Sequence, residues 1–269
     1  MKKALQEDIG SGDITTSAIV CQEQKGVGHV IAQEELVVAG IDVCLRVFEM
    51  IDQMDSERYV CDGQVVKPGE EICKTSGKLQ TILTGERVAL NFLQRMSGIA
   101  TLSRKYVDAI NGYKTKIVDT RKTTPGMRIL EKYAVKVGGA RNHRFGLFDG
   151  ILIKDNHIIA AGGITSAVQS TRENVSHMMK IEVEVGSIAE CIEALEAGAD
   201  VIMLDNMDID EMKEAVAYAG GKVLIEASGK VALERVVDIA KTGVDLISIG
   251  SLTHSFRSVD ITMEIECLS

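Results

Sequence analysis

From residue 116 onward, short apolar runs alternate with stretches of helical spacing, and this alternation constrains the fold more than any other feature of the sequence. Six runs predict β-strands, at residues 116–119, 150–154, 180–185, 200–205, 222–227 and 245–250. Between them the spacing predicts helices, among others at 128–137, 188–197, 210–219 and 231–241. Successive βα units build a parallel sheet, and their short spacing favours a closed or nearly closed barrel over an open doubly wound sheet. We therefore predict an α/β barrel with fewer than eight strands.

The part of the chain before residue 113 has a different pattern. Short β-branched runs within 26–39 and 58–75 are broken by the turn signals Asp62-Gly63 and Pro68-Gly69, which predict a small antiparallel sheet. Apolar residues at helical spacing predict a helix at 41–51 and a longer one from about 84 to 110. Within the longer helix, Ser97-Gly98 is expected to permit close packing. A separate α+β domain therefore precedes the predicted barrel.

Polar residues follow each of the six predicted barrel strands. They are Asp119 to Lys122, Lys154 to His157, Glu184, Asp205-Asn206, Ser228-Gly229 and Ser248 to Gly250. In a parallel barrel the carboxyl ends of the strands open onto one face, where such folds place their active sites. A polar residue after a single strand is ordinary. Six such ends, basic on the early strands and acidic or glycine-containing on the later ones, favour a ligand site.

The segment from Lys114 to His157 is basic, with ten Lys and Arg against four Asp and Glu in a chain of formal net charge −9. Arg121, Lys122, Arg144 and Lys154 offer donors suited to carboxylates and phosphates. By contrast, Arg128, Lys132 and Lys136 fall at helical spacing and are expected on a solvated helix face. The segment therefore predicts an anion-binding pocket flanked by surface charge.

The later strand ends complement these cations. Glu184 and Asp205 suit sugar hydroxyls, a divalent metal, or the basic side chains that they hold in place. Small residues at 228–229 and 248–251 suit a phosphate bound by backbone N–H groups. A phosphosugar together with a second, carboxylated substrate would use all of these groups.

Composition excludes several other classes of protein. No segment approaches eighteen uninterrupted apolar residues and the first residues have no apolar signal-peptide centre, so we expect a cytoplasmic protein without a membrane partner. The six cysteines form no CxxC pair, which argues against a zinc site or a disulfide framework. With no Trp, 4% aromatic residues and a negative net charge, a nucleic-acid partner is not expected.

Motifs along nearly the whole chain resemble the quinolinate phosphoribosyltransferase family, also called nicotinate-nucleotide pyrophosphorylases (carboxylating), among the type II phosphoribosyltransferases. The most specific is DTRKTTPGMRILEKYAVKVGGARNHR at 119–144. The others, in the family's order, are EDIGSGDITT (7–16), ERVALNFLQRMSGIAT (86–101), LIKDNH (152–157), EVEV (182–185), MLDN (203–206), EASG (226–229) and SIGSLTHS (248–255). Alone, EDIGSGDITT or MLDN would be a weak signal.

The resemblance implies a pentosyltransferase of de novo NAD biosynthesis. Quinolinate and phosphoribosyl pyrophosphate would give nicotinate mononucleotide, pyrophosphate and CO2, with Mg2+ carried mainly on the pyrophosphate. The implied fold is an N-terminal α+β open sandwich over 1–112 followed by an incomplete, seven-stranded TIM-like α/β barrel over 113–255. The tail 256–269 would join the first domain. The working unit would be a homodimer or a higher homo-oligomer, with the N-terminal part of one subunit covering the barrel mouth of the other.

The resemblance also implies roles for individual residues. Quinolinate carboxylates would bind Arg121, His143, Arg144 and Lys154, with Arg87 contributed by the neighbouring subunit. Thr120 and Lys122 would line the same mouth, and Glu184 and Asp205 would bind ribose hydroxyls and Mg2+. The 5′-phosphate would be surrounded by Ser228, Gly229, Ser248, Ile249 and Gly250. Lys122, Lys154, Glu184 and Asp205 are the expected catalytic residues.

The sequence departs from the family pattern at three places. Only six residues precede Glu7, so part of an N-terminal helix is expected to be missing or replaced. Ala140 stands where a third glycine is common, which is tolerable if this residue does not need a positive φ. Lys230 follows Ser228-Gly229 where a small residue is common, and either contacts phosphate or points to solvent.

Three other functions stay open from the sequence. The nearest is a phosphoribosyltransferase that acts on nicotinate or a related monoacid, although retention of Arg87, Arg121, His143 and Arg144 favours a diacid. A barrel aldolase that uses Lys154 as a Schiff-base lysine is a different chemistry. A non-catalytic binder of phosphorylated metabolites would bind ligand and form no product.

Overall fold

The computed structural model describes residues 1–268, and the chain forms two compact units. The first unit comprises residues 1–104, 129–139 and the described tail from residue 256, and the barrel unit comprises 105–128 and 140–255. The division thus falls inside the long helix rather than after residue 112. It also places 129–139, which the sequence pattern assigns to the barrel, with the first unit.

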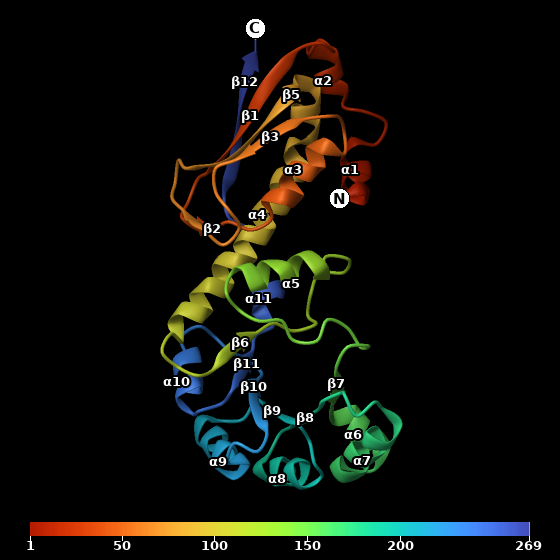
Figure 1. The fold of residues 1–269 in the computed structure, drawn as a ribbon, viewed down its shortest axis with the longest axis vertical. Helices are drawn as coiled ribbons and strands as arrows, with labels where there is room; N and C mark the ends of the chain where they lie inside the picture. Colours follow the sequence, from red (N-terminus) through yellow and green to blue (C-terminus); the bar gives the residue numbers. More distant parts are fainter. Residues whose placement is uncertain (269) are drawn as a thin grey trace. The chain divides into compact units, whose positions relative to one another are not determined.

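An antiparallel sheet forms the centre of the first unit (Figure 1). Its strands lie in the order β12 (Ile261–Leu268), β1 (Lys25–Ala32), β5 (Glu71–Lys78) and β3 (Asp55–Arg58), and β2 (Leu36–Val37) pairs separately with β4 (Val65–Val66). The helices of this part are α1 (Lys2–Ile9), α2 (Ile14–Ile19), α3 (Ile41–Glu49), α4 (Leu79–Ala109) and α5 (Arg128–Val137). The antiparallel sheet and the two helices expected from spacing are therefore present.

Two glycines of α4 explain how closely this helix packs. A Cβ on Gly85 would lie 2.8 Å from the ring of Phe48, which is fully buried on α3. A Cβ on Gly98 would lie 2.2 Å from the carbonyl oxygen of Arg257, so only glycine admits the tail backbone at this point. The close packing predicted for Ser97-Gly98 is confirmed.

The solvated face expected for α5 is wrong at Lys132. This side chain is 3% exposed, and its neighbour Glu131 is fully buried, whereas Lys136 is exposed. The burial of Glu131 has its reason on α4, where Arg95 donates to Glu131 Oε1 from both Nη2, at 2.6 Å, and Nε, at 3.2 Å. A charged helix face can be buried when another element supplies partners of opposite charge.

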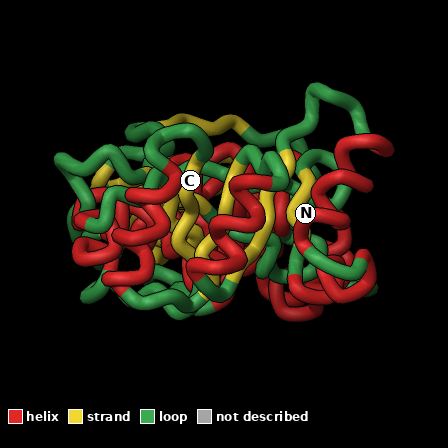
Figure 2. Tube along the Cα trace, turned by 90° about the horizontal axis from the view of Figure 1, so that it is seen from below, coloured by secondary structure: helices red, strands yellow, loops and turns green. Residues whose placement is uncertain are grey.

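Six parallel strands form the sheet of the barrel unit, and all six predicted strands are present. Their order is β6 (Lys116–Val118), β11 (Leu246–Ser248), β10 (Leu224–Ser228), β9 (Val201–Asp205), β8 (Ile181–Val185) and β7 (Ile151–Ile153). The helices are α6 (Asp155–Ala161), α7 (Ile164–Asn174), α8 (Ile188–Glu196), α9 (Ile209–Ala219), α10 (Val236–Lys241) and α11 (Ser251–His254). Figure 1 shows α7, α8 and α9 outside the strands, as in a TIM-like barrel, and Figure 2 shows helices (red) flanking strands (yellow).

The seventh strand of the expected barrel is reduced to one residue. Arg141 forms a parallel bridge with Val118 of β6, donating to Ile117 O at 2.9 Å and accepting from Asp119 N–H at 3.0 Å. The next residues leave the ladder because Asp119 accepts from Asn142 Nδ2 at 2.7 Å and from His143 N–H at 2.8 Å. The expectation of seven strands is therefore corrected to six strands and a bridge.

Side chains alternate along the barrel strands. On β8, Ile181, Val183 and Val185 are buried among apolar neighbours, while Glu182 and Glu184 point to the other face. The register pairs Asp205 at the end of β9 with Ser228 at the end of β10. The polar ends of adjacent strands are consequently level with one another.

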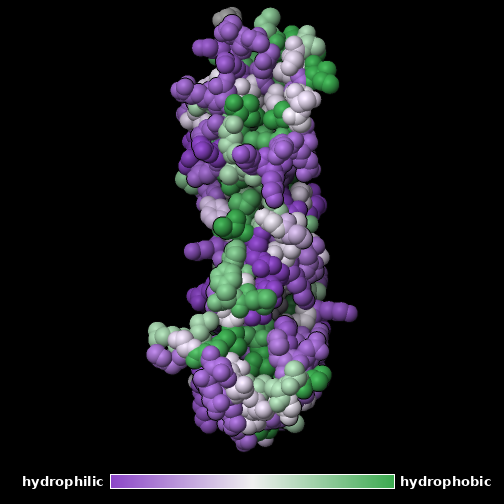
Figure 3. Space-filling view, turned by 90° about the vertical axis from the view of Figure 1, so that its right-hand side faces the viewer, coloured by the Kyte–Doolittle hydropathy of each residue, from purple (hydrophilic) through white to green (hydrophobic). Residues whose placement is uncertain are grey.

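The molecular surface mixes polar and apolar residues. On the face drawn in Figure 3, hydrophilic residues (purple) cover much of the surface and hydrophobic residues (green) form smaller patches. The most exposed large hydrophobic side chains include Ile14, Phe148 and Ile159. Among the helices within residues 1–268, none is both long enough and apolar enough to cross a membrane.

Candidate active site

A cavity of about 1010 Å³ lies at the carboxyl ends of the barrel strands, and all its lining residues belong to the barrel unit. The lining includes every residue that the sequence proposed for substrate except Arg87: Thr120, Arg121, Lys122, His143, Arg144, Lys154, Glu184, Asp205, Ser228, Gly229, Ser248, Ile249 and Gly250. Arg87 lies on α4 in the first unit, with its side chain 59% exposed and 3.5 Å from Glu86.

Two arginines give the cavity a strongly cationic wall. Arg144 donates from Nη1 to the carbonyl oxygen of Gly150 at 3.0 Å, which fixes its guanidinium. Burial lowers the pKa of Arg144, and the positive charge of Arg121 lowers it further. The buried Nε of Arg121 has no hydrogen-bond partner within the described chain. A buried, unsatisfied cationic donor is costly, and an anion placed there would relieve this cost.

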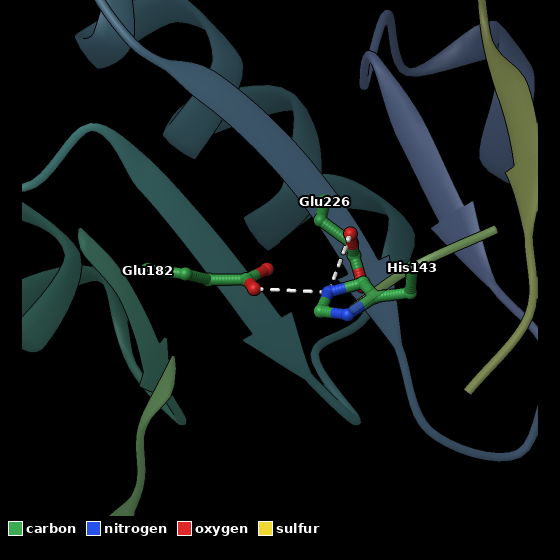
Figure 4. A group of neighbouring side chains, drawn as sticks. All are labelled: His143, Glu182 and Glu226. Atoms are coloured by element: carbon green, nitrogen blue, oxygen red, sulfur yellow. Dashed lines mark hydrogen bonds and ion pairs between the residues drawn. The ribbon is translucent and has the colours of Figure 1, made fainter. Parts of the chain in front are cut away.

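The ring of His143 is held by hydrogen bonds on both nitrogens. Nδ1 accepts the backbone N–H of Arg144 at 2.8 Å, so the ring carries its proton on Nε2. Nε2 lies 2.9 Å from Glu182 Oε2 and 3.7 Å from Glu226 Oε2 (Figure 4). Both glutamates come from barrel strands, and the imidazole lies between them.

Lys122 is positioned by Thr120, just after β6, and by Thr253 of α11. Its backbone N–H donates to Thr120 Oγ1 at 3.0 Å, and its carbonyl accepts from Thr253 Oγ1 at 2.8 Å. Arg128 braces the same loop, donating to Thr123 Oγ1 at 2.9 Å and to Phe145 O at 3.0 Å. Arg128 therefore supports the cavity loop rather than contributing to a solvated helix face.

Acidic oxygens occupy the opposite part of the cavity. Lys154 forms an ion pair with Glu184 Oε2, and Asp205 Oδ2 accepts from Asn206 Nδ2 at 2.8 Å. Both carboxylates are half-buried at the ends of neighbouring strands. Such hard oxygen donors suit ribose hydroxyls, or Mg2+ that also binds substrate phosphates.

The loop after β10 gives the cavity a glycine-lined wall. Gly229 has φ of +117°, and a Cβ there would lie 2.3 Å from Asn206 Oδ1. That same oxygen accepts the N–H of Lys230 at 3.3 Å. Lys230 to Glu234 also line the cavity, so the helix expected at 231–241 begins only at Val236. Residues 231–234 therefore form part of the cavity wall instead of a first turn of the helix.

The end of β11 supplies buried small residues. Ser248 is 3% exposed, and the buried Oγ of Ser251 has no hydrogen-bond partner within residues 1–268. Ile249 is buried and its N–H donates to Val118 O at 3.0 Å, so this N–H is already used. Ser248, Gly250 and Ser251 are therefore better placed than Ile249 to contact a ligand.

Sequence reasoning did not single out Glu182 or Glu226, the two acids beside His143. A signal for both existed, because Glu182 lies two residues before Glu184 and Glu226 lies two residues before Ser228. Residues two apart on a strand share a face. When the polar residue at the end of a strand lines a cavity, the residue two positions earlier is therefore a further candidate for the site. His157, by contrast, does not line the cavity, and its Nδ1 accepts the N–H of Lys154 at 3.0 Å.

Comparison with family models decides the relationship. The model described as Quinolinate phosphoribosyl transferase, C-terminal domain matches residues 99–264, and the corresponding N-terminal domain matches residues 13–97. The chain belongs to the quinolinate phosphoribosyltransferase family. Its motifs therefore reflect true membership of this enzyme family, and the expectation drawn from them is confirmed.

Relatives within the quinolinate phosphoribosyltransferase family match almost the whole chain. The probable nicotinate-nucleotide pyrophosphorylase (carboxylating) of Bacillus subtilis is 45% identical over 260 residues, covering 96% of this chain and 90% of that protein. The Synechocystis protein of the same name is 45% identical over 269 residues, covering 98% and 91%. The crystal structure of NadC from Streptococcus pyogenes is 40% identical with a TM-score of 0.96, covering 100% of this chain and 95% of that one.

Proposed function

We propose that this protein transfers the phosphoribosyl group of phosphoribosyl pyrophosphate to quinolinate and removes one carboxylate, giving nicotinate mononucleotide, pyrophosphate and CO2 for NAD biosynthesis. One observation carries the proposal: Arg121, whose buried Nε has no hydrogen-bond partner within the described chain, lies in the same cavity as Arg144, His143, Lys154 and the acids Glu184 and Asp205. Such a cavity offers cations for two carboxylates and oxygens for a sugar. The family names of the relatives describe the same chemistry.

The proposed mechanism follows from these charges. The pyridine nitrogen attacks the anomeric carbon of the ribose as the bond to pyrophosphate breaks, so negative charge grows on the leaving group. Lys122 and Lys154 would stabilise this charge, and no side-chain nucleophile is needed. Once the ring nitrogen is quaternary, the bond to the adjacent carboxylate can break, releasing CO2, because the electron pair left on the ring carbon lies beside N⁺. That carbon then takes up one proton from solvent to give nicotinate mononucleotide. Positioning of the carboxylate by Arg121 and Arg144 then suffices.

Mg2+ is proposed as the cofactor, and the donor set fits it. Asp205 and Glu184 are oxygen ligands on neighbouring strands, and oxygen donors with substrate phosphates are what Mg2+ prefers. When bound, Mg2+ would offset the negative charge of pyrophosphate. Glu184 would have to share its carboxylate with Lys154, whereas the hydrogen bond that Asp205 accepts within residues 1–268, from Asn206, goes to Oδ2 and leaves Oδ1 for a ligand.

We also propose a homodimer or higher homo-oligomer in which Arg87 acts in the site of the neighbouring subunit. Its exposed side chain is available for such a role. The test mixes inactive Arg87→Ala and Arg121→Ala proteins under conditions of demonstrated subunit exchange. Activity should return in the mixed population, since some dimers then carry one intact site. Exchange without recovered activity would contradict a shared site.

The central test is a product assay with purified protein, Mg2+ and phosphoribosyl pyrophosphate, run separately with quinolinate and nicotinate. We expect Mg2+-dependent nicotinate mononucleotide from quinolinate, because Arg121, His143 and Arg144 together favour a dianion. Product from nicotinate alone would instead support the monoacid enzyme. Ligand binding without product from either acid would contradict the proposed reaction.

A further inference from the structure

Glu226 is a fully buried acid in the cavity lining that makes no conventional hydrogen bond. It is 0% exposed on β10, and neither carboxylate oxygen has a hydrogen-bond partner within the described chain. Met203 on β9 and Leu246 on β11 lie beside it in the sheet, and neither ionises. An ionised carboxylate without partners at such a position is strongly disfavoured.

The nearest ionisable groups are a second acid and a histidine. Glu182 is 6% exposed, and its Oε2 takes the proton that His143 Nε2 can donate (Figure 4). Nε2 of His143 lies 2.9 Å from Glu182 Oε2 and 3.7 Å from Glu226 Oε2, so Glu182 is the acid that engages its proton. Burial and the charge of Glu182 raise the pKa of Glu226 to about 7, while the charge of His143 and the nearby hydroxyl of Ser248 act in the opposite direction. Two buried carboxylates with one donor between them cannot both ionise readily.

Most other charged groups of the cavity are either acids that have partners or cations, and the acid Glu234 is exposed to solvent. Asp119 accepts two hydrogen bonds, Glu184 pairs with Lys154, and Asp205 accepts from Asn206. The cations are Arg121, Lys122, Arg144, Lys154 and, on the loop after β10, Lys230; that loop also brings Glu234, and α11 brings His254. The ionisation state of Glu226 thus changes the net charge of a cavity whose remaining charges are largely compensated or positive.

The three residues His143, Glu182 and Glu226 also form a group that could hold a metal ion. The separation of 2.9 Å between Nε2 and Glu182 Oε2 is, however, the ordinary length of an N–H···O hydrogen bond. A proton on that line accounts for the distance, whereas a metal ion would have to replace it. Proton chemistry is therefore the better account of this group.

We propose that Glu226 is a proton store that sets the charge of the cavity, so that the dianionic substrate binds tightly only when Glu226 is protonated. This inference rests on the proposed function, since it takes a diacid as the ligand. Where Glu226 is ionised in the free protein, binding draws a proton from solvent onto its carboxylate, forming one O–H bond. That proton returns to solvent when the anionic ligand leaves. Substrate affinity should consequently fall as pH rises through the range in which Glu226 ionises.

The test measures quinolinate binding by titration calorimetry from pH 6 to 8.5, in two buffers of different ionisation enthalpy, together with kcat/KM for quinolinate. For the wild-type protein we expect the affinity for quinolinate to fall above pH 7, with a limiting slope of about tenfold per pH unit. Binding should take up at most one proton per site. Glu226→Gln, which imitates the protonated acid, should keep the affinity of pH 6 throughout the range and take up no proton. A wild-type slope in Glu226→Gln would overturn the inference.

Two further variants make the test specific. Glu214→Gln removes an exposed acid of α9 and should retain the wild-type profile. Glu182→Gln removes the like charge that raises the pKa of Glu226, so the loss of affinity should begin at a lower pH. An unchanged profile in Glu182→Gln would contradict the coupling even if Glu226→Gln failed to fold. Quinolinate binding without pH dependence would overturn this inference alone, whereas absence of quinolinate binding at every pH would overturn the proposed function and the inference with it.

Discussion

Two glutamates of this molecule are equally buried and have opposite surroundings. Glu131 on α5 and Glu226 on β10 are both 0% exposed. Glu131 accepts two hydrogen bonds from the guanidinium of Arg95, whereas Glu226 has no hydrogen-bond partner in the described chain and lies beside a histidine that another acid already engages. A buried charge whose hydrogen bonds are satisfied is typical of a structural ion pair, whereas a buried acid without such bonds is a candidate residue of a functional site.

The largest effect is expected from breaking the matched pair. Glu131→Ala removes the carboxylate that accepts two hydrogen bonds from Arg95, whose side chain is 27% exposed. The free energy of unfolding should fall by about 3 kcal/mol, since removing one member of a buried pair leaves an uncompensated charge. Urea denaturation followed by circular dichroism measures this change. A loss below about 1 kcal/mol would show that the pair is not important for the first unit.

A double substitution separates the pair from the packing around it. Arg95→Met combined with Glu131→Leu removes both charges and keeps apolar volume, so its unfolding free energy should recover to within about 1 kcal/mol of wild type. A double variant as unstable as Glu131→Ala would mean that α5 needs the hydrogen bonds themselves. The same denaturation measurement distinguishes the two cases.

The second effect concerns the unmatched acid and depends on pH. The folded-state pKa of Glu226 is raised to about 7, above its ordinary value, so the folded protein binds more protons than the unfolded chain between these two values. Stability therefore falls as pH rises through this window, by up to about 3 kcal/mol from this group. Glu226→Gln should be close to wild type at pH 5 and more stable than wild type at pH 8. Denaturation at both pH values measures the difference, and equal pH dependence in the two proteins would count against an ionising Glu226.

The contrast also explains how far the sequence could predict the structure. Period-two and helical spacing are local, and they correctly predicted the six barrel strands and helices such as α3 and α5. Because carboxyl ends of parallel strands meet on one face, the strand-end residues from Thr120 to Gly250 were also correctly brought together. The rule about strand ends does not apply to Arg87, since this residue belongs to a helix of the first unit.

What the sequence could not predict depends on partners distant in the chain. Helical spacing indicates which residues share a face, but it does not show that Lys132 is buried rather than solvated. The seventh strand stops at Arg141 because the carboxylate of Asp119 takes the following N–H groups. The state of Glu226 likewise depends on Glu182 and His143, which come from other strands and loops.

The smallest effect is expected where an ion pair is exposed. Arg46 and Glu49 form an i,i+3 pair at 2.8 Å on α3, with side chains 59% and 41% exposed. Glu49→Gln should change the unfolding free energy by no more than about 0.5 kcal/mol, because water and salt screen such a pair. This distance is close to the 2.6 Å between Arg95 and Glu131, so the comparison separates the effect of burial from that of pairing. If Glu49→Gln cost as much as Glu131→Ala under the same denaturation conditions, proximity of charges rather than burial would govern stability, and the distinction between the two buried glutamates would lose its physical basis.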